Sequence, residues 1–267
     1  MKTIDILSII ILTYNEDLNI EKCLESALKL TKNIYIIDSY STDKTIETCK
    51  KYNTNIYQHK FTNQANQINW ALKNIKINTD WVLRLDADEY LTEKLIWEIK
   101  ERLLGLNKNI SGIFLKRRVY FMQKWIKHGG YYPTYLLRIW RNGHAVCESK
   151  LMDEHMKLTK GNSITFKNDF IDHNNKNLHW WINKHNNYAT REAIELLNIK
   201  YTFFKRQEVK PSLLGTQEQR KRWLKEKIYF NIPLFARPWI YFLYRYFIKL
   251  GFLDGKQWLM WHFFQGL

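Results

Sequence analysis

The sequence predicts an α/β fold with a mostly parallel central sheet flanked by helices, followed by a helical, aromatic and basic C-terminal extension. Three observations support this prediction. Strand-like and helix-like segments alternate from residue 5 to residue 104, the predicted strands end in polar residues, and the last quarter of the chain is rich in aromatic and basic side chains. With 267 residues, of which 45% are hydrophobic, the chain can bury a substantial core.

Hydrophobic periodicity places the elements of the first part in order. Apolar runs predict strands at residues 5–12, 34–38, 55–58 and 81–86. Apolar side chains at helical spacing predict helices at residues 20–28, 44–52, 65–75 and 93–104. Parallel strands joined by crossover helices form a sheet that is covered on both faces, so the strands are expected to be buried.

The pattern changes after residue 105. Residues 111–121 read as a strand, 125–143 as a loop and a strand, 147–158 as a turn between extended pieces, and 177–197 as a long helix. We find neither an internal repeat nor a low-complexity linker. We therefore expect one domain over residues 1–200 and an extension over residues 201–267.

Charge and cysteine content narrow the class of protein. The formal net charge is +16, and from Lys200 onward 13 Lys and Arg residues face 4 Asp and Glu residues, which predicts attraction to polyanions. The three cysteines lack metal-ligand spacing, so a reduced, intracellular protein is expected. The first apolar run is short and contains Asp5, which argues against a signal peptide and for a cytosolic location.

Acidic side chains gather at the predicted strand ends although the chain is basic. Asp38 ends the second strand, and Asp86 and Asp88 end the fourth. On an extended segment Asp86 and Asp88 share one side, roughly 6 to 7 Å apart, and they repel each other unless a cation lies between them. Ligands of such sheets bind beyond the carboxyl ends of the strands, so a cation-dependent site is expected there. Asp17 and Asp43 have an alternative role as helix N-caps.

The residues at these strand ends resemble the inverting family 2 glycosyltransferases of the GT-A fold. The resemblance rests on three ordered motifs, "SIIILTYNEDLNIEKCLES", "IYIIDSYSTDKTIE" and "DWVLRLDADE", the last being similar to the family's DXD motif. Later segments, "WIKHGGYYPTYLLRIW", "MDEH" and "RPWIYFLYRYFIKLGFLDGK", resemble the bacterial subgroup that builds lipopolysaccharide cores, capsules and related surface glycans. The ordered set carries the resemblance, because a DXD triplet alone is common.

The resemblance implies transfer of a sugar, with a hexose as the expected group, from a nucleotide-sugar donor to a hydroxyl of a saccharide or lipid-linked saccharide. A UDP-sugar is the expected donor, bound by residues 1–105, while residues 106–200 would bind the acceptor. A Mg²⁺ or Mn²⁺ ion held by carboxylates would neutralise the diphosphate leaving group. Asp88 is the first choice of metal ligand, and Asp86 would bind the ribose or a metal-bound water.

The same resemblance implies further donor-binding residues. Asp38 would accept a hydrogen bond from the base, and Asp43 would support the pocket. The expected donor-binding residues are Thr13, Tyr14, Asn15, Glu16, Asp38, Ser41, Asp43, Asn66, Gln67, Arg84, Asp86, Ala87 and Asp88.

Transfer also needs a general base for the acceptor hydroxyl. The family places an acid at the position of "LMDEHM", where Asp153 and Glu154 are the candidates. The order Asp-Glu-His departs from the commoner Glu-Asp, so the choice stays open, with Glu154 favoured. His155 could contact a metal or phosphate, or be a packed histidine.

The segment "HGGYYP" combines paired glycines with two tyrosines that could stack on a sugar ring. An ordinary turn with packed aromatic residues is the alternative. Arg138 and Arg117 could pair with phosphates of donor or acceptor. The expected acceptor-binding residues are His128, Gly129, Gly130, Tyr131, Tyr132 and Arg138.

The C-terminal region cannot supply a complete membrane span, which needs about 20 apolar residues. Residues 228–264 are interrupted by Arg237, Arg245, Lys249, Asp254 and Lys256. Aromatic residues interleaved with cations suit helices in the headgroup layer of an anionic membrane, which predicts a peripheral protein on the inner face of the cytoplasmic membrane. Packing on the catalytic domain or on another subunit is the alternative, and the oligomeric state stays open.

Two other function classes fit the sequence less well. A basic nucleic-acid-binding module would use the cations and aromatic rings, but the acids at the strand ends would repel phosphates, so no nucleic-acid partner is expected. A non-catalytic membrane scaffold would have no need to keep Asp38, Asp86, Asp88 and Glu154 together.

Overall fold

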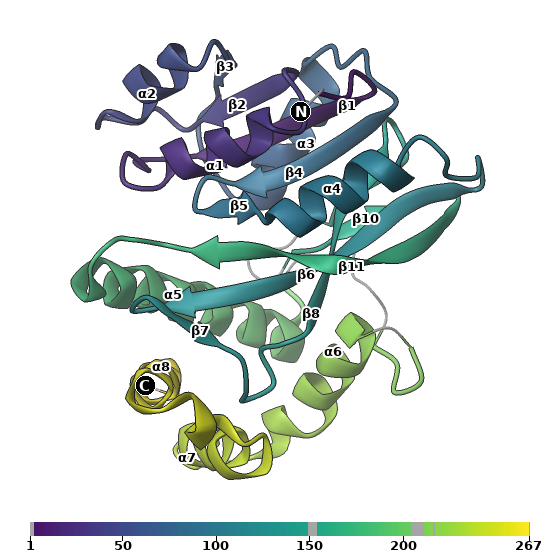
Figure 1. Ribbon diagram of the computed structural model, residues 1–267. Coiled ribbons are helices and arrows are strands. Elements are labelled where there is room, and N and C mark those ends of the chain that lie inside the picture. Colours follow the sequence, from purple (N-terminus) through teal and green to yellow (C-terminus); the bar gives the residue numbers. More distant parts are fainter. Residues whose placement is uncertain (1–2, 149–153, 204–210, 216, 267) are drawn as a thin grey trace.

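Four parallel strands and their helices build the first half of the molecule, seen at the top of Figure 1. The structure is a computed structural model that describes residues 3–148, 154–203, 211–215 and 217–266. The strands are β1 (Leu7–Thr13), β2 (Ile34–Asp38), β3 (Asn55–Gln58) and β4 (Trp81–Asp86). The helices are α1 (Ile20–Leu28), α2 (Thr45–Lys51), α3 (Gln64–Asn74) and α4 (Glu93–Arg102). All eight lie close to their predicted ranges.

Alternate side chains of these strands are buried on opposite faces of the sheet. Ile9 and Ile11 join one apolar cluster with residues of α1 and α4, while Ile10 and Leu12 join another with residues of α3. Burial on both faces explains why the strands read as continuous apolar runs. It also leaves the carboxyl ends of the strands as the open, polar edge of this half.

Seven further strands occur among the residues that the structure describes. They are β5 (Glu89–Leu91), β6 (Ile110–Phe121), β7 (Lys124–Ile126), β8 (Thr134–Arg141), β9 (Ala145–Cys147), β10 (Met156–Leu158) and β11 (Asn162–His173). The large sheet has nine strands in the order β3-β2-β1-β4-β8-β6-β11-β5, with β7 paired to β6, and β9 pairs with β10 separately. Strand β11 runs parallel to β6, and β8 is antiparallel to both β4 and β6. The predicted α/β class with a mostly parallel central sheet is confirmed.

Three of these strands, β5, β7 and β11, have no counterpart in the sequence prediction. Strand β7 lies where the loop that begins the stretch 125–143 is predicted. Strand β5 is three residues long, too short for a periodic signal. Strand β11 carries a register shift between Thr165 and Asp169, and this irregularity breaks the alternation of apolar and polar side chains. Part of the predicted turn at 147–158, namely residues 149–153, lies outside the described residues.

The remaining elements are helical. They are α5 (Leu178–Tyr201), α6 (Gln217–Lys227), the short turn η1 (Tyr229–Asn231), α7 (Arg237–Leu243), its π-helical continuation η2 (Tyr244–Ile248), the turn η3 (Gly251–Asp254) and α8 (Lys256–Gly266). Trp258 and Trp261 of α8 form a third apolar cluster with Trp181 of α5 and with Val119 and Phe121 of β6. The C-terminal extension therefore packs on the rest of the chain, as one of the two alternatives predicted. No described helix combines the length and the apolar character that a membrane crossing requires.

Close backbone contact with Trp258 accounts for two glycines. A Cβ at Gly251 would lie 1.8 Å from Trp258 Cζ2, and one at Gly129 would lie 2.5 Å from Trp258 Nε1. Gly129 of "HGGYYP" and Gly251 thus leave room for an indole ring of the C-terminal extension. We name η2, η3, α7 and α8 together (residues 237–266) the C-terminal unit.

Replacing Gly251 with alanine is expected to lower the free energy of unfolding by about 1 to 3 kcal/mol, because the new methyl group must displace the Trp258 ring. Urea denaturation followed by tryptophan fluorescence measures the change. Gly105→Ala is the matched control, since the nearest atom to its Cβ is 3.9 Å away. Equal stability of the two variants would contradict the seating of Trp258 described above.

Candidate active site

A cavity of about 1000 Å³ lies beyond the carboxyl ends of β1 and β4. Its wall on the side of the sheet includes Thr13, Tyr14, Glu16, Gln64, Gln67, Asp86, Ala87 and Asp88. Helix α5 supplies the opposite wall with Trp181, Lys184, His185, Tyr188 and Arg191. Many of the predicted donor-binding residues therefore border one cavity, and a helix that the sequence did not assign to the donor site closes it.

The two aspartates of "DADE" do not share one strand. Asp86 ends β4, whereas Ala87 and Asp88 form a turn before β5. The expectation that the two carboxylates lie side by side on an extended segment is therefore wrong. The turn places each carboxylate in its own surroundings.

Asp86 lies among protein cations. Its carboxylate is 3.3 Å from Arg84 Nη2 and 3.6 Å from Arg138 Nη2, and it accepts hydrogen bonds of 3.2 Å from Gln64 Nε2. Burial disfavours the charged carboxylate, but Arg84 and Arg138 outweigh it and lower the pKa of Asp86 to about 2. The positive charge that the sequence pattern called for comes in part from these two guanidinium groups.

Glu89 anchors Arg138 inside the sheet. The Glu89 side chain is 2% exposed, accepts a hydrogen bond of 2.9 Å from the Asp86 backbone amide, and forms an ion pair with Arg138. Burial, followed by the charge of Asp86, raises the pKa of Glu89 to about 8 despite the guanidinium. Arg138 is itself 5% exposed. Its expected contact with the acceptor stays a prediction, and its observed role is to hold the two acids.

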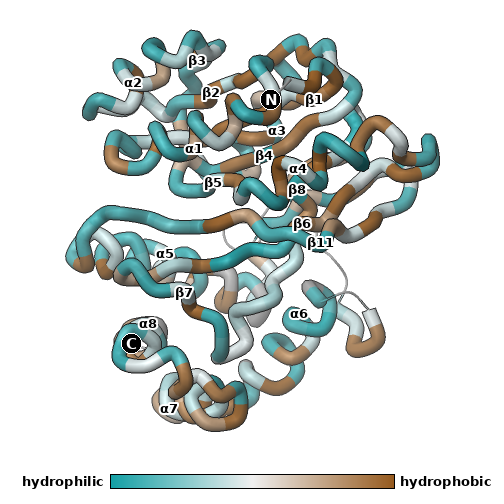
Figure 2. Tube along the Cα trace, in the orientation of Figure 1, coloured by the Kyte–Doolittle hydropathy of each residue, from teal (hydrophilic) through white to brown (hydrophobic). Residues whose placement is uncertain are grey.

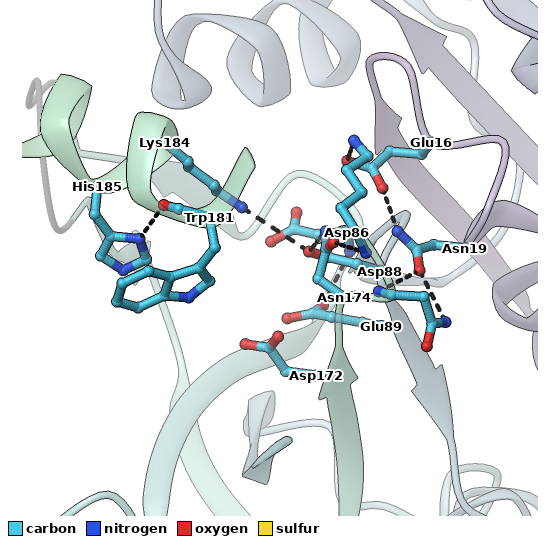
Figure 3. A network of polar contacts seen from close by, with 12 residues as sticks. Glu16, Asn19, Asp86, Asp88, Glu89, Asp172, Asn174, Trp181, Lys184 and His185 are labelled. Carbon is cyan, nitrogen blue, oxygen red and sulfur yellow. Dashed lines mark hydrogen bonds and ion pairs between the residues drawn. The ribbon is translucent and has the colours of Figure 1, made fainter. Parts of the chain in front are cut away.

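Asp88 faces helix α5 across the cavity (Figure 3). Its Oδ2 accepts a hydrogen bond of 3.0 Å from Asn174 Nδ2 and lies 4.0 Å from Lys184 Nζ. Burial disfavours the charged ammonium, yet Asp88 and then Tyr188 raise the pKa of Lys184 above its usual range. We name the cavity-lining acids Glu16, Asp86 and Asp88 the acidic rim. Lys184 is therefore a cation held at the acidic rim.

A second lysine, Lys176, pairs with Glu16 of the acidic rim. Lys176 Nζ lies 2.8 Å from Glu16 Oε1, and Asn19 Nδ2 donates to Glu16 Oε2 at 2.6 Å. The backbone amide of Asn175 donates to Asn19 Oδ1 at 2.9 Å. Burial and the nearby charge of Asp88 raise the pKa of Glu16. The segment between β11 and α5 is thereby tied to the end of β1.

No motif of the sequence singles out Asn174, Lys176 or Lys184 as donor-site residues. The available signal was the polar run "DHNNKN" after β11, which reads as a loop. Nothing in its spacing relates it to Asp88, which is 86 residues from Asn174 along the chain.

The loop after β2 is held by Asp38. This fully buried carboxylate accepts hydrogen bonds from the Ser41 amide, at 2.9 Å, and the Ser41 hydroxyl, and one of 3.3 Å from Gln58 Nε2. The Ser41 hydroxyl in turn accepts from the Asn15 amide at 2.9 Å. Asp43 accepts from the Thr45 amide at 2.9 Å, although the N-cap residue of α2 is Lys44. The expected contact between Asp38 and a base stays a prediction.

Three other expected donor residues differ in their surroundings. Thr13 is 5% exposed and borders the cavity, and its hydroxyl has no hydrogen-bond partner among the described residues. Such a buried group needs a ligand or water. Gln67 borders the same cavity and donates to Ser39 Oγ at 3.1 Å. Asn66 is exposed and donates to Thr62 Oγ1 at 2.7 Å beside the first turn of α3.

The segment "HGGYYP" joins the C-terminal unit to the sheet. His128 is bound by Asp254, whose Oδ2 accepts from the His128 amide at 2.7 Å, and the Gly129 amide donates to the Lys249 carbonyl at 2.9 Å. Tyr132 donates to Asp169 at 3.0 Å. Tyr131 borders the cavity, and its ring centroid lies 5.4 Å from that of Trp261. Most of this segment is therefore a turn with packed aromatic residues, which was the alternative to a sugar-binding segment. Tyr131 is in contact with the cavity.

The two candidates for the general base fare differently. Asp153 lies outside the described residues. Glu154 lies within electrostatic reach of Arg84: burial alone would lower the pKa of Arg84, but the charges of Asp86 and then Glu154 raise it above its usual range. His155 Nδ1 is 2.9 Å from Glu148 Oε1, so the packed alternative describes this histidine.

The acidic rim fits a divalent cation held together with a substrate. In the part of the chain that the structure describes, no group of three or more His, Cys, Asp or Glu side chains could hold a metal ion by itself. Mg²⁺ is usually bound by one or two carboxylates plus substrate phosphates, and Asp88 offers such hard oxygen ligands at the cavity wall. The approach of Lys184 shows that this rim already favours a positive charge.

Comparisons with known proteins show the family and the fold of this chain. The model of the family described as glycosyl transferase family 2 matches residues 8–153, a little over half of the chain. An uncharacterised glycosyltransferase of Rickettsia conorii is 31% identical over 94 residues, which are 35% of this chain and 33% of that protein. A second one, of Rickettsia bellii, is 29% identical over 39% of this chain and 34% of that protein. The chain thus matches about a third of the length of these curated relatives.

Two solved structures extend the comparison to the fold. S. aureus TarS in complex with UDP-GlcNAc is similar over 89% of this chain and 80% of that chain, with a TM-score of 0.51 and 17% identity. Glucosyl-3-phosphoglycerate synthase from Mycobacterium tuberculosis, in complex with Mn²⁺, UDP and glucosyl-3-phosphoglycerate, covers 43% of this chain and 44% of that chain at a TM-score of 0.35 and 17% identity. The first likeness shows a shared fold. Because the family model covers more than half of the sequence, the chain belongs to glycosyl transferase family 2.

Proposed function

We propose that the protein is a metal-assisted, inverting glycosyltransferase that moves a sugar, with a hexose as first choice, from a UDP-sugar to a hydroxyl of a surface glycan such as a lipopolysaccharide core, a capsule or a lipid-linked saccharide. One observation supports this most directly. The cavity beyond β1 and β4 brings the acids Glu16, Asp86 and Asp88 opposite Lys184 of α5. Such a mixed rim can hold a diphosphate together with a cation.

Charge complementarity assigns the donor roles. Asp88 would hold Mg²⁺ or Mn²⁺, which when bound would neutralise the charge of the departing diphosphate as a Lewis acid. Lys184 directs an ammonium group to the same rim and adds positive charge for that leaving group. Arg84 and Arg138 keep Asp86 ionised, so that it can accept hydrogen bonds from the donor. Thr13 offers the donor a buried hydroxyl.

The acceptor hydroxyl must lose its proton as it attacks. Glu154 is our choice of general base, supported by the effect of its charge on Arg84, the cation that pairs with Asp86. A single displacement by the acceptor on the face opposite the leaving diphosphate inverts the configuration of the transferred sugar.

The far end of the cavity suits a saccharide acceptor. Phe121 of β6, Tyr131, Trp181 and Trp261 lie close together and border it there. Aromatic rings of this kind stack on the apolar faces of sugars. The acceptor would therefore lie between α5 and the C-terminal unit, which supports an acceptor that is presented at the membrane surface.

Isothermal titration with UDP tests the donor proposal. We expect binding in the presence of Mn²⁺ or Mg²⁺ and at least tenfold weaker binding in EDTA, because the acids alone repel the diphosphate. A panel of UDP-, GDP- and dTDP-sugars, followed by nucleotide release, then identifies the donor. Absence of nucleotide binding in every metal condition would refute the transferase proposal.

A further inference from the structure

One face of α7 and η2 presents apolar side chains to solvent at helical spacing. Two neighbouring apolar side chains are exposed at every fourth position, with exposed fractions between 44% and 71%. These side chains are Trp239, Ile240, Leu243, Tyr244, Phe247 and Ile248. Phe235, just before α7, is 89% exposed. We name these seven residues the apolar stripe. Hydrophobic stretches of α7 are visible at the lower edge of the molecule in Figure 2.

The opposite face of the same helix already has its partners. Phe242 and Tyr246 stack with ring centroids 5.3 Å apart, and Tyr246 lies 5.0 Å from Trp258. Arg245 stacks 4.3 Å above Tyr131, a residue of the cavity wall. The protein core therefore orients α7 and η2, and this orientation leaves the apolar stripe outward. A helix that is packed on one face and exposes apolar side chains on the other has a second apolar surface that needs a partner.

Charge around the apolar stripe points to an anionic occupant. From residue 228 to residue 266 the sequence contains four cations, Arg237, Arg245, Lys249 and Lys256, and a single acid, Asp254. That acid is 5% exposed and is bound to His128, so it does not face outward. Lys249 and Lys256 are exposed. Lys249 lies 5.6 Å from the ring of Tyr244, so two copies that met through the apolar stripe would bring their Lys249 ammonium groups together, which disfavours a symmetric dimer.

We propose that the apolar stripe docks on a bilayer surface that contains anionic lipid. Trp and Tyr rings favour the headgroup level, Phe, Leu and Ile enter the boundary of the acyl chains, and lysines beside them meet lipid phosphates. The His128–Asp254 contact and the seat of Trp258 then hold the aromatic end of the cavity close to that surface. The proposal extends the proposed function by naming the surface where the acceptor is met.

Vesicle sedimentation of the full chain tests this inference without donor, acceptor or metal. Unlabelled protein is mixed with vesicles of phosphatidylcholine, or of phosphatidylcholine with about one third phosphatidylglycerol. We expect binding to the anionic vesicles, and at least tenfold weaker binding by the double variant Trp239→Ser, Phe247→Ser. Both side chains are exposed, so folding is retained, and thermal unfolding checks this.

Trp97→Ser provides the matched control. Trp97 is 60% exposed on α4, on the first half of the molecule, and its loss should leave vesicle binding unchanged. Failure of the wild-type chain to bind anionic vesicles, or equal losses in Trp97→Ser and the double variant, would overturn the proposal. A dimer seen by light scattering that the double variant dissociates, with vesicle binding unchanged, would make the apolar stripe a subunit interface instead. None of these outcomes would refute the transferase proposal, which rests on nucleotide binding.

Discussion

Replacing Asp88 with asparagine is expected to lower turnover by about a hundredfold to a thousandfold and to remove the effect of Mn²⁺ on UDP binding. The reason is electrostatic. Asp88 is the carboxylate at the turn after β4 that faces the cavity, and its loss leaves the Lys184 ammonium without the negative charge 4.0 Å away. Isothermal titration with and without Mn²⁺, together with steady-state rates, measures both effects.

Asp80→Asn is the matched control for that experiment. Asp80 is an exposed acid that directly precedes the first residue of β4, at the end of the strand far from Asp88. Its substitution changes the net charge as much as Asp88→Asn does but leaves the acidic rim intact. Its turnover and its response to Mn²⁺ should equal those of the wild type. A variant Asp88→Asn that keeps a metal-dependent affinity for UDP would remove Asp88 from the metal site.

Converting Glu154 to glutamine is expected to reduce turnover by about 10² to 10⁴-fold while leaving the affinity for UDP unchanged. Glutamine keeps the size of the side chain but cannot take the proton of the acceptor hydroxyl. The affinity is spared because the donor is held by the rim at the ends of β1 and β4. Single-turnover kinetics with the donor already bound separates the chemical step from binding.

Asp153→Asn and Glu101→Gln complete the set. Glu101 is exposed on α4 and should behave as the wild type. If Asp153→Asn loses turnover and Glu154→Gln retains it, the general base is Asp153 and our assignment is reversed.

The cations beside the acidic rim could be predicted from the sequence only in part. The sequence shows two aspartates close together and predicts a compensating cation, for which a divalent ion is the hypothesis. The folded chain supplies Arg84 from the same strand, Arg138 from β8 and Lys184 from α5. Only Arg84 is near these aspartates along the chain, so the other two cannot be recognised from spacing. A bound metal ion remains a proposal, and it would act together with these protein cations.

The sequence by itself determined the strands and helices of the first half and the polar edge where they end. These features depend on interactions within a few residues: apolar runs mark strands buried on both faces, and parallel strands of one sheet place their carboxyl ends together. The sequence therefore predicts that Asp86 and Asp88 lie at this polar edge, and their contact with a ligand stays a prediction. The interleaving of aromatic residues with cations over residues 228–264 was equally visible.

Only the tertiary structure decided which distant residues complete the site. Asn174 reaches Asp88, Lys176 reaches Glu16 across 160 positions, and Trp258 enters the space left open by Gly129 and Gly251. It also decided which face of α7 and η2 is turned outward. The physical reason is that these contacts follow from the packing of whole helices against the sheet, which depends on the shapes of both partners and leaves no periodic trace in either segment.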